Sequence, residues 1–473
     1  MKVRVTARMP EILLACATLI PLIGCQGLKN SSPGSGSVNQ LNHIVFMVQE
    51  NRSFDTYFGK LPAYWQSHGF PSQAFDGLPA DASNPSFDGL STVSAFHLPT
   101  VCIQNVSAFW NEDHFDWNRN DPTSAMATMD GFVFTAAHYA QTAPANEAPI
   151  FDTEGHRAIG YYDGSDLNYY YFMASHFATS DRWFSPAMTR TQPNRLYLLA
   201  GTSFGLVYPP NTVFNPESAP MLVDKSNLEP HTDPFTQDNI FTLLDRANVS
   251  WKIYETDPGT AYIHYFEPYA TQHAANIVPV SQYLTDVQNQ TLPAVALIEG
   301  GYNSGRDEHP LNNIQTGAAY VESLINALMS SPSWKDSAFI LTWDEAGGLY
   351  DHVPPPSAVS PDGIPPSDLQ PGDVCQAGPS SGANCDFNHT GFRVPLLVVS
   401  PFTKKNFVSH TVADYTAILK LIETRFNLPS LTKRDAAQMD MSEFFDFDNP
   451  PWMTPPTPPA QNTNGVCDYH ALP

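Results

Sequence analysis

The run Glu50-Asn51-Arg52-Ser53-Phe54-Asp55-Thr56-Tyr57 follows the apolar stretch Ile44-Val45-Phe46-Met47-Val48 almost directly. A short apolar stretch of this kind predicts a buried strand. The carboxylate of Glu50 and the amide of Asn51 then stand where that strand ends. In α/β proteins ligands bind beyond the carboxyl ends of the strands, and carboxylate and amide oxygens suit hard metal ions. The run therefore predicts a site for metal-assisted phosphoester chemistry.

The same arrangement recurs near residue 344. The apolar segment 338–343 leads directly into Asp344-Glu345-Ala346-Gly347-Gly348. Parallel strands place their carboxyl ends at one edge of a sheet. The two strand ends therefore offer three carboxylates and one amide to a common site.

The rest of the chain alternates expected strands and helices, a pattern typical of an α/β fold with a mainly parallel central sheet flanked by helices. We expect strands at 43–49, 250–254, 292–298, 338–343 and 393–399, and helices at 166–179, 239–248, 315–330 and 414–426. Residues 60–110 and 205–235 show little periodicity and much Pro, Ser and Asn. We interpret them as long loop insertions over the active face.

The composition fits an ordered protein with many rigid turns. Of 473 residues, 15% are charged, 12% are aromatic and 43 are Pro. This length allows one catalytic domain with insertions, which we expect at residues 41–447. The proline-rich segment 448–473 is expected to form an extended strap.

The chain is strongly acidic, with a formal charge of −24. A surface of this sign repels polyanions, so nucleic acid is excluded as a partner. The acidity itself is explained by the solubility of an exported protein. A phosphate-bearing substrate must then be attracted locally, by a metal ion or by a few placed cations.

The N-terminus has the pattern of an export signal over residues 1–24. A basic start precedes an apolar run that is shorter than the roughly 20 residues needed to span a bilayer. The sequence Leu22-Ile23-Gly24-Cys25 resembles the lipobox of bacterial lipoproteins, which implies lipidation of Cys25 and a flexible tether over residues 25–40. We expect a periplasmic or cell-surface lipoprotein held to a membrane by this anchor. Ordinary secretion, with Cys25 an incidental thiol, is the alternative.

Four further cysteines are expected to form two disulfides, because an even number in an exported chain favours pairing. Cys375 and Cys385 bracket a Gly/Ser/Pro loop and are expected to pair locally, which leaves Cys102 to hold the tail through Cys467. Four cysteines allow three pairings in all. No cysteine spacing is typical of a zinc site.

Five motifs follow one another along the chain. They are Glu50-Asn51-Arg52-Ser53-Phe54-Asp55, Met129-Asp130-Gly131-Phe132, Thr191-Gln192-Pro193-Asn194-Arg195, Asp307-Glu308-His309-Pro310, and Thr342-Trp343-Asp344-Glu345 with Asp351-His352. In these motifs the chain resembles the bacterial phosphoesterase family that contains phosphatidylcholine-type phospholipases C and acid phosphatases. That family is a branch of the alkaline-phosphatase-like fold, and the resemblance covers residues 43 to about 430.

The resemblance implies roles for seven residues. Thr191 matches the family's hydroxyl nucleophile, His309 and His114 match two histidines around the phosphoryl group, and the metal ligands match Glu50, Asn51, Asp344 and Glu345. All-oxygen ligation suits a divalent metal ion such as Mg, Ca, Mn or Fe, which polarises a phosphoryl oxygen.

Thr191 also suits its role locally. It lies just before Pro193, as in the first turn of a helix that ends at Gly201, and backbone N–H groups there would face a phosphate. A simple helix cap is the alternative role for Thr191.

Other polar side chains near the motifs have two interpretations. His352, Asn194, Arg195 and Asp130 are either substrate contacts or structural supports. A single histidine among 15 is more often structural. The aromatic cluster within residues 161–172 either cages a quaternary ammonium group or is part of the core.

One motif competes with this interpretation. Gly201-Thr202-Ser203-Phe204-Gly205 fits the nucleophile elbow of lipases, which requires a strand before the serine and a helix after it. Here the preceding residues 194–200 are expected to be helical, and two prolines follow at 209–210. A serine hydrolase is therefore disfavoured.

We interpret the chain as a metal-dependent phosphoester hydrolase. The resemblance favours a phospholipase C that acts on choline-type phospholipids through a phosphothreonine intermediate. A broad-specificity acid phosphatase acting on phosphomonoesters is the alternative, although the paired histidines of such enzymes do not occur here. A surface lipoprotein that binds ligand without turnover is the remaining possibility.

Overall fold

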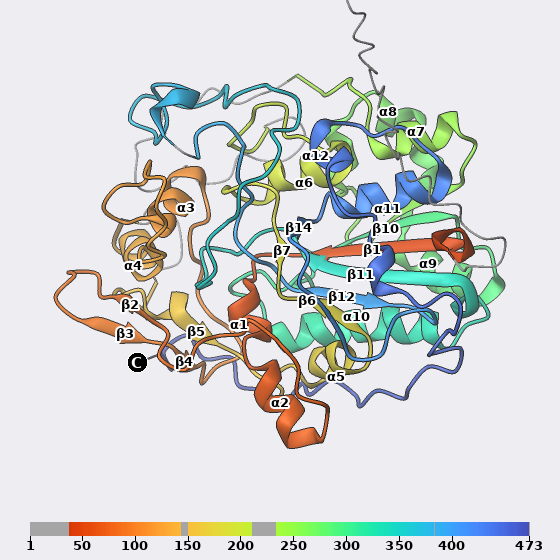
Figure 1. Ribbon diagram of the computed structural model, residues 1–473, viewed down its shortest axis with the longest axis horizontal. Coiled ribbons are helices and arrows are strands. Elements are labelled where there is room, and N and C mark those ends of the chain that lie inside the picture. The colour runs from red at the N-terminus through yellow and green to blue at the C-terminus, as the bar shows by residue number, and fades with distance from the viewer. Residues whose placement is uncertain (1–36, 143–149, 211–232, 383, 473) are drawn as a thin grey trace, which may run out of the picture. The chain divides into compact units, whose positions relative to one another are not determined.

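A computed structural model describes residues 37–142, 150–210, 233–382 and 384–472. Eight strands form its central sheet, as Figure 1 shows. Their spatial order is β13 (Phe407–Ser409), β6 (Ala178–Ser180), β12 (Leu396–Val399), β11 (Ser337–Trp343), β1 (His43–Gln49), β10 (Val295–Glu299), β8 (Trp251–Glu255) and β9 (Ile277–Pro279). In this sheet β12 alone runs antiparallel to its neighbours. The predicted α/β fold with a mainly parallel sheet is confirmed.

The centre of the sheet brings the two predicted strand ends together. β1 pairs in parallel with β10 on one side and with β11 on the other, and Gln49 lies opposite Trp343. Every residue of β11 is buried, as are six of the seven in β1. Glu50 and Asp344 therefore leave the sheet side by side at its carboxyl edge.

The four predicted helices are present with shifted ends. They are α5 (Asn168–His176), α7 (Ile240–Arg246), α10 (Ile314–Met329) and α11 (Ala417–Phe426). The prediction ran the first of these helices to residue 179, which is wrong because Ala178–Ser180 forms β6 between β12 and β13. Likewise α11 begins late, since Ala413–Asp414 forms β14 and pairs with β7 (Trp183–Phe184).

Three strands of the central sheet and several other elements were not expected from the sequence. The strands are β6, β9 and β13, each only three residues long. The helix expected to end at Gly201 is present as α6 (Thr191–Ala200). The further elements that were not expected include α1 (Phe54–Phe58), α3 (Trp110–Trp117), α4 (Phe132–Thr142), α8 (Tyr269–Gln272), α9 (Val280–Asn289), α12 (Lys433–Ala436) and β5 (Gly160–Tyr161).

The insertion over residues 60–110 contains more structure than its composition indicates. It holds α2 (Leu61–His68), β2 (Ser83–Pro85), β3 (Thr92–Ser94) and β4 (Phe96–His97), drawn in orange in Figure 1. Its end closes on the loop after β11: a Cβ at Gly348 would lie 2.3 Å from the carbonyl oxygen of Ser107, and the φ of Gly348 is +68°. Only glycine fits there. Residues 211–232 of the second insertion lie outside the described residues.

Only the last residues of the predicted N-terminal segment, 37–40, lie within the described part of the chain. The export signal and Cys25 lie outside the described residues. The tether was expected to reach residue 40, which is too far, because Val38–Gln40 forms a helical turn that contacts α11 and buries Val38. In the described part of the chain, no helix has the length and apolar character needed to cross a membrane.

The proline-rich strap is fastened along its length. Residues 36–473 form one compact unit that includes it. The side chain of Gln461 accepts a hydrogen bond from Tyr169 N, at the start of α5, and its backbone N–H donates to Glu322 of α10. The strap ends at the disulfide Cys102–Cys467, and the second disulfide is Cys375–Cys385. Both predicted pairings are present.

Candidate active site

Glu50 is the centre of the group of polar residues at the carboxyl edge of the sheet. It is the first residue after β1 and is 3% exposed. Its Oε2 accepts a hydrogen bond from Thr191 Oγ1 at 3.2 Å and lies 3.6 Å from Nε2 of His309. A candidate nucleophile and a candidate acid therefore face the same carboxylate oxygen.

The other oxygen of Glu50 is held by two side chains. Arg195 Nη2 contacts Oε1 at 2.5 Å, and the Tyr262 hydroxyl donates to it at 3.3 Å. Arg195 also donates to Val48 O at 2.9 Å and is 3.5 Å from Glu299. These contacts hold the buried guanidinium of Arg195 against Glu50, so we interpret Arg195 as the residue that orients Glu50.

Thr191 is the first residue of α6, and Arg190 occupies the cap position. The helix-cap interpretation of Thr191 is therefore wrong. The turn before the helix is fixed by Asn194, whose amide accepts from Ala187 N at 3.0 Å and donates to Thr189 O at 2.6 Å. Asn194 thus supports the position of Thr191 rather than facing a substrate. The helix N-terminus at Thr191 suits a phosphate group.

His309 is oriented by a neighbouring carboxylate. Its Nδ1 lies 2.7 Å from Asp307 Oδ2, so this nitrogen carries the hydrogen and Nε2 faces Glu50. Burial lowers the pKa of His309, but Asp307 and Glu50 outweigh it and the pKa is raised. Asp307 is also tied to the site by its backbone, because its carbonyl accepts from Glu50 N at 2.9 Å.

The donor set of Asn51, Asp344 and Glu345 fits a divalent cation. Three buried oxygens, Asn51 Oδ1, Asp344 Oδ2 and Glu345 Oε1, accept no hydrogen bond within the described residues. Burial raises the pKa of both carboxyl groups, and the charges of Glu50 on Asp344 and of Asp344 on Glu345 raise them further. Buried oxygens that accept no hydrogen bond are costly, and a bound cation would compensate the amide oxygen and both carboxyl oxygens.

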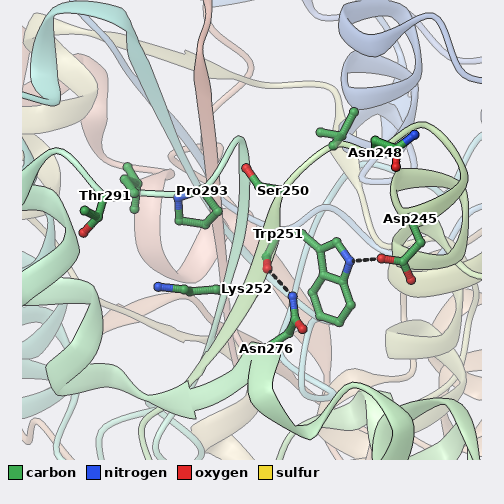
Figure 2. Close-up of a pocket in the computed structure, with 10 residues that line it drawn as sticks. Asp245, Asn248, Ser250, Trp251, Lys252, Asn276, Thr291 and Pro293 are labelled. Atoms are coloured by element: carbon green, nitrogen blue, oxygen red, sulfur yellow. Dashed lines mark hydrogen bonds between the residues drawn. The ribbon is translucent and has the colours of Figure 1, made fainter.

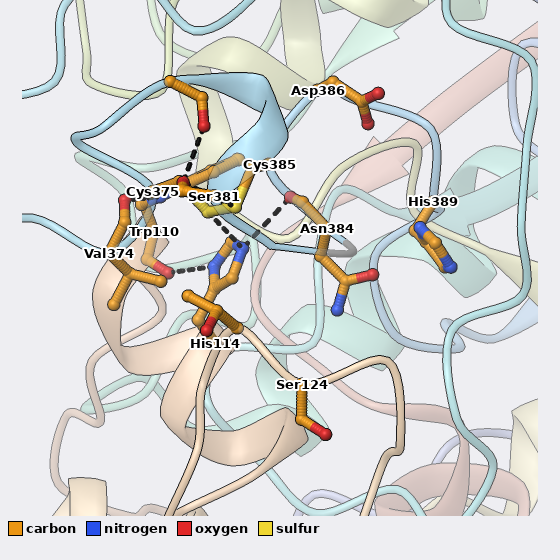
Figure 3. Close-up of a disulfide and its surroundings, with 12 residues drawn as sticks. Trp110, His114, Ser124, Val374, Cys375, Ser381, Asn384, Cys385, Asp386 and His389 are labelled. Atoms are coloured by element: carbon orange, nitrogen blue, oxygen red, sulfur yellow. Dashed lines mark hydrogen bonds between the residues drawn. A yellow bond between two sulfur atoms is a disulfide. The ribbon is translucent and has the colours of Figure 1, made fainter.

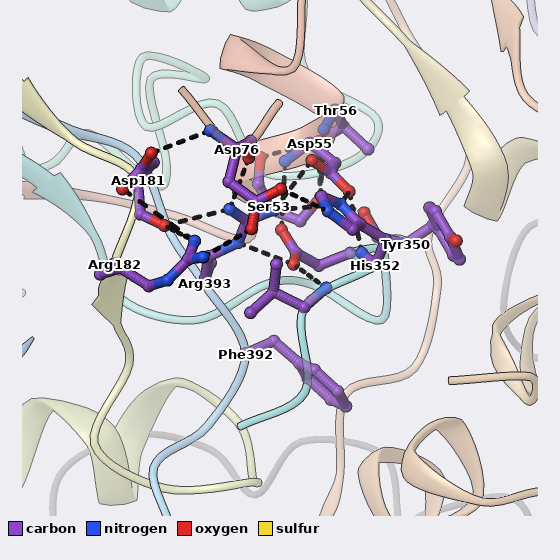
Figure 4. Close-up of polar contacts among 12 residues, drawn as sticks. Ser53, Asp55, Thr56, Asp76, Asp181, Arg182, Tyr350, His352, Phe392 and Arg393 are labelled. Atoms are coloured by element: carbon purple, nitrogen blue, oxygen red, sulfur yellow. Dashed lines mark hydrogen bonds and ion pairs between the residues drawn. The ribbon is translucent and has the colours of Figure 1, made fainter. Parts of the chain in front are cut away.

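His352 belongs to a different cluster. Its Nδ1 lies 2.7 Å from Asp55 and its Nε2 lies 3.0 Å from Asp76 (Figure 4). Within the described residues, Asp55, Asp351 and His352 form one of two three-residue groups whose ligating atoms lie within 4.8 Å of one another. The carboxylates of Glu50, Asp344 and Glu345 do not form such a group. However, Arg393 pairs with Asp351 at 2.8 Å and with Asp55 at 3.0 Å, which neutralises the group. The structure therefore places His352 in a supporting network.

The structure does not bring His114 to Thr191. His114 is fully buried on α3, with Nδ1 2.6 Å from Trp110 O and Nε2 3.2 Å from Asn384 O. Figure 3 shows it beneath the disulfide Cys375–Cys385. Burial lowers its pKa to about 4. Both ring nitrogens face backbone carbonyl oxygens, of which the neutral ring can donate to one, so this histidine has a structural environment.

Three other sequence features also have structural roles. Ser203 follows helix α6 rather than a strand, which excludes the nucleophile elbow. The tyrosines of the aromatic cluster that lie at 162 and 169–171 are at most 1% exposed, which favours the alternative that the cluster is part of the core. Asp130 accepts from Arg119 N at 2.9 Å and from the Thr128 hydroxyl.

Some site residues were not identified from the sequence. Tyr262 lies in a short 3-10 turn with no motif around it, and Glu299 ends strand β10 without a pattern of its own. Asp307 belongs to the motif Asp307-Glu308-His309-Pro310. Its position two residues before His309 is the sequence signal that could have identified it as the partner of that histidine. Arg190 lies beside the site, where its charge acts on Glu345 and Asp344 and its guanidinium lies 4.2 Å from the ring of Phe109.

A surface pocket of about 560 Å³ lies at the opposite edge of the sheet (Figure 2). It is lined by the start of β8 and by the residues before β10. Its polar groups serve the fold: Trp251 Nε1 donates to Asp245 at 2.8 Å, and Asn276 donates to Trp251 O at 2.8 Å. The pocket is therefore separate from the group around Glu50.

Comparison with known proteins gives consistent matches over most of the chain. A model of the phosphoesterase family matches residues 41–429. Phospholipase C B of Mycobacterium tuberculosis (strain ATCC 25618 / H37Rv) is 30% identical over 460 residues, which cover 89% of this chain and 80% of that protein. Non-specific phospholipase C4 of Arabidopsis thaliana is 28% identical over 86% of this chain and 72% of that protein. Among solved structures, human ectonucleotide pyrophosphatase / phosphodiesterase 5 aligns with 56% of this chain and 90% of that one, at a TM-score of 0.34 and 12% identity.

Proposed function

Because the chain belongs to the phosphoesterase family and is a phosphoester hydrolase, we propose that it is a metal-dependent phospholipase C acting on choline-type phospholipids. The observation that carries this proposal is the convergence of Thr191 and His309 on one oxygen of Glu50. Relatives named phospholipase C support a phospholipid substrate, and the choline head group rests on the resemblance to the family. The products are diacylglycerol and a phosphorylated head group.

Each of the site residues has a separate role in the proposed reaction. Glu50 orients the Thr191 hydroxyl and can take its proton as Oγ1 attacks phosphorus. The N–H groups at the start of α6 face the phosphoryl oxygens. His309 donates the proton on Nε2 to the leaving alcohol oxygen, and Asp307 holds the other ring nitrogen. Water then cleaves the phosphothreonine, which restores the hydroxyl.

A divalent cation would be held by Glu50, Asn51, Asp344 and Glu345. When bound, such an ion polarises a phosphoryl oxygen and lowers the pKa of a nearby hydroxyl. Its identity is left open by an all-oxygen donor set, which suits Mg, Ca, Mn or Fe. Lipidation at Cys25 would place this site beside a membrane, in the periplasm or on the cell surface.

The test uses purified protein and phosphatidylcholine, with and without chelator, beside Thr191→Ala. We expect diacylglycerol and phosphocholine in the mass spectrum, lost with chelator and at least about 10³-fold reduced in the variant. Hydrolysis of phosphomonoesters without lipid product would favour the phosphatase alternative. Release of fatty acid would overturn the proposed chemistry.

A further inference from the structure

An exposed apolar rim lies beside His309. Tyr302, Leu311 and Phe151 are 62%, 45% and 48% exposed. The rings of Tyr302 and His309 lie 5.2 Å apart, and Leu311 follows His309 by two residues. Large apolar side chains grouped in this way on a solvent-exposed surface indicate an interaction site.

The C-terminal tail completes this rim. The Tyr469 hydroxyl donates to Leu311 O at 2.6 Å, and the ring of His470 lies 3.8 Å from that of Phe151. We use the name His309 rim for Tyr302, Leu311, Tyr469, His470 and Phe151. Its members come from four separate parts of the chain. Tyr302 packs against His309, Tyr469 is hydrogen-bonded to Leu311, and His470 packs against Phe151.

The rim is built on a rigid base. Leu311 N donates to Ile103 O at 2.6 Å, and Phe151 N donates to the side chain of Gln104 at 2.6 Å. The adjacent residue Cys102 is bonded to Cys467, two residues before Tyr469. The disulfide therefore holds the tail against the segment that supports Leu311 and Phe151, so the apolar side chains are presented in a fixed arrangement.

We infer that the His309 rim seats the protein on the surface of a zwitterionic phospholipid membrane, so that a head group reaches His309 and Thr191. This inference rests on the proposed function. The formal charge of −24 disfavours an anionic membrane. Apolar insertion of Tyr302, Leu311 and Phe151 supplies the binding instead, and salt affects it little.

The test compares two double variants. Phe151→Ser/Leu311→Asn removes apolar surface from the rim, and Asn tolerates the φ of +84° at position 311. Leu90→Ser/Met126→Ser removes two other exposed apolar side chains, 87% and 72% exposed, that have no described contact with the rim. Each protein is measured by co-sedimentation with phosphatidylcholine vesicles at low and high salt, and by hydrolysis of water-soluble p-nitrophenylphosphorylcholine.

We expect the rim variant to lose about tenfold in vesicle partitioning, because two partly buried apolar side chains no longer insert. Its rate of hydrolysis of the soluble substrate stays within about twofold of the wild-type rate. Its melting temperature stays within about 2 °C of the wild-type value. The control variant partitions as wild type does. Unchanged partitioning of the rim variant, or an equal loss in the control, would overturn the inference.

Two further outcomes separate this inference from the proposed function. If the wild-type protein hydrolyses neither substrate but binds vesicles through the rim, the proposed function is wrong and the rim is still a membrane-binding surface. If wild type is a dimer that the rim variant dissociates, a second copy of the chain covers the rim and the membrane inference is wrong. Should the double variant melt early, the single variant Phe151→Ser gives the same comparison, since its side chain is half exposed.

Discussion

Arg195 and Glu50 form a buried ion pair, with Nη2 and Oε1 2.5 Å apart. Because this contact uses one carboxylate oxygen, the other is left to Thr191 and His309. Helix α6 contributes both Arg195 and Thr191, four residues apart and so on one helical face. A single helix thus fixes the candidate nucleophile and the orientation of the group that receives its hydrogen bond.

Arg195→Lys is expected to keep the charge but to lose the simultaneous contacts with Glu50, Glu299 and Val48 O. We expect turnover to fall about 10–100-fold with a small change in stability. Arg195→Met leaves the buried carboxylates of Glu50 and Glu299 without their cationic partner and lowers the free energy of unfolding by about 3–5 kcal/mol. The control is Arg246→Lys, in an exposed pair with Asp238, which should change neither kcat nor urea stability. Equal activity of Arg195→Lys and wild type would contradict this role.

His352 is expected to make stability depend on pH. Burial lowers its pKa, but Asp55 and Asp351 raise it overall, against a smaller opposing effect of Arg393. A histidine with a raised pKa in the folded state contributes stability that is complete below the unfolded value of 6.5 and is lost as pH rises through the folded value.

The corresponding variant is His352→Asn. We expect it to lower the free energy of unfolding by about 1–3 kcal/mol at pH 5.5 and by less at pH 8.5, because the charged hydrogen bonds to Asp55 and Asp76 exist mainly below the folded pKa. Urea unfolding at the two pH values measures this difference. His68→Asn, at an exposed histidine, serves as control. A loss of unfolding free energy that grows with pH would contradict a raised pKa of His352 in the folded state.

The disulfide Cys102–Cys467 is expected to contribute more stability than Cys375–Cys385. The bonded cysteines are 365 residues apart in the first and 10 in the second, and a longer closed loop loses more entropy in the unfolded chain. The double serine variant at 102 and 467 should lose about 2–5 kcal/mol in urea unfolding. The matched variant at 375 and 385 should lose less. The reverse order would indicate that the long loop is already ordered in the unfolded state.

The parts of the fold that the sequence predicted are those with a local signal. β1 and β11 are continuous apolar runs, and α6 has Pro193 near its start and Gly201 at its end. β6 has three residues and exists only because β12 and β13 pair with it, so no local pattern could indicate it.

The same limit applies to the candidate site. Glu50 and Asp344 were identified because each directly follows a strand that the sequence predicts. The pairing of Arg195 with Glu50 depends on how α6 packs against the sheet, and the environment of His114 depends on Asn384, 270 residues away. Such contacts are set by tertiary packing, which the spacing of residues in one sequence does not encode.

Metal binding gives a prediction that does not depend on turnover. Glu50, Asp344 and Glu345 are buried and repel one another, so a cation that binds them stabilises the folded chain. At about 100 times its dissociation constant, the ion would add about 2.7 kcal/mol. We expect the melting temperature to fall by several degrees after chelation and to recover when the correct divalent ion returns.

Two variants locate the ion. Asp344→Asn should abolish the recovery, because it removes one negative charge from the set around Glu50. Asp163→Asn alters the second three-residue group, His97, Asp163 and Asp166, whose ligating atoms also lie within 4.8 Å of one another at the surface. This variant should recover as wild type does. If instead Asp163→Asn abolishes the recovery and Asp344→Asn preserves it, the stabilising ion binds at the surface group. Protonation of Asp344 and Glu345, whose pKa values are raised by burial, then relieves the repulsion among the buried carboxylates.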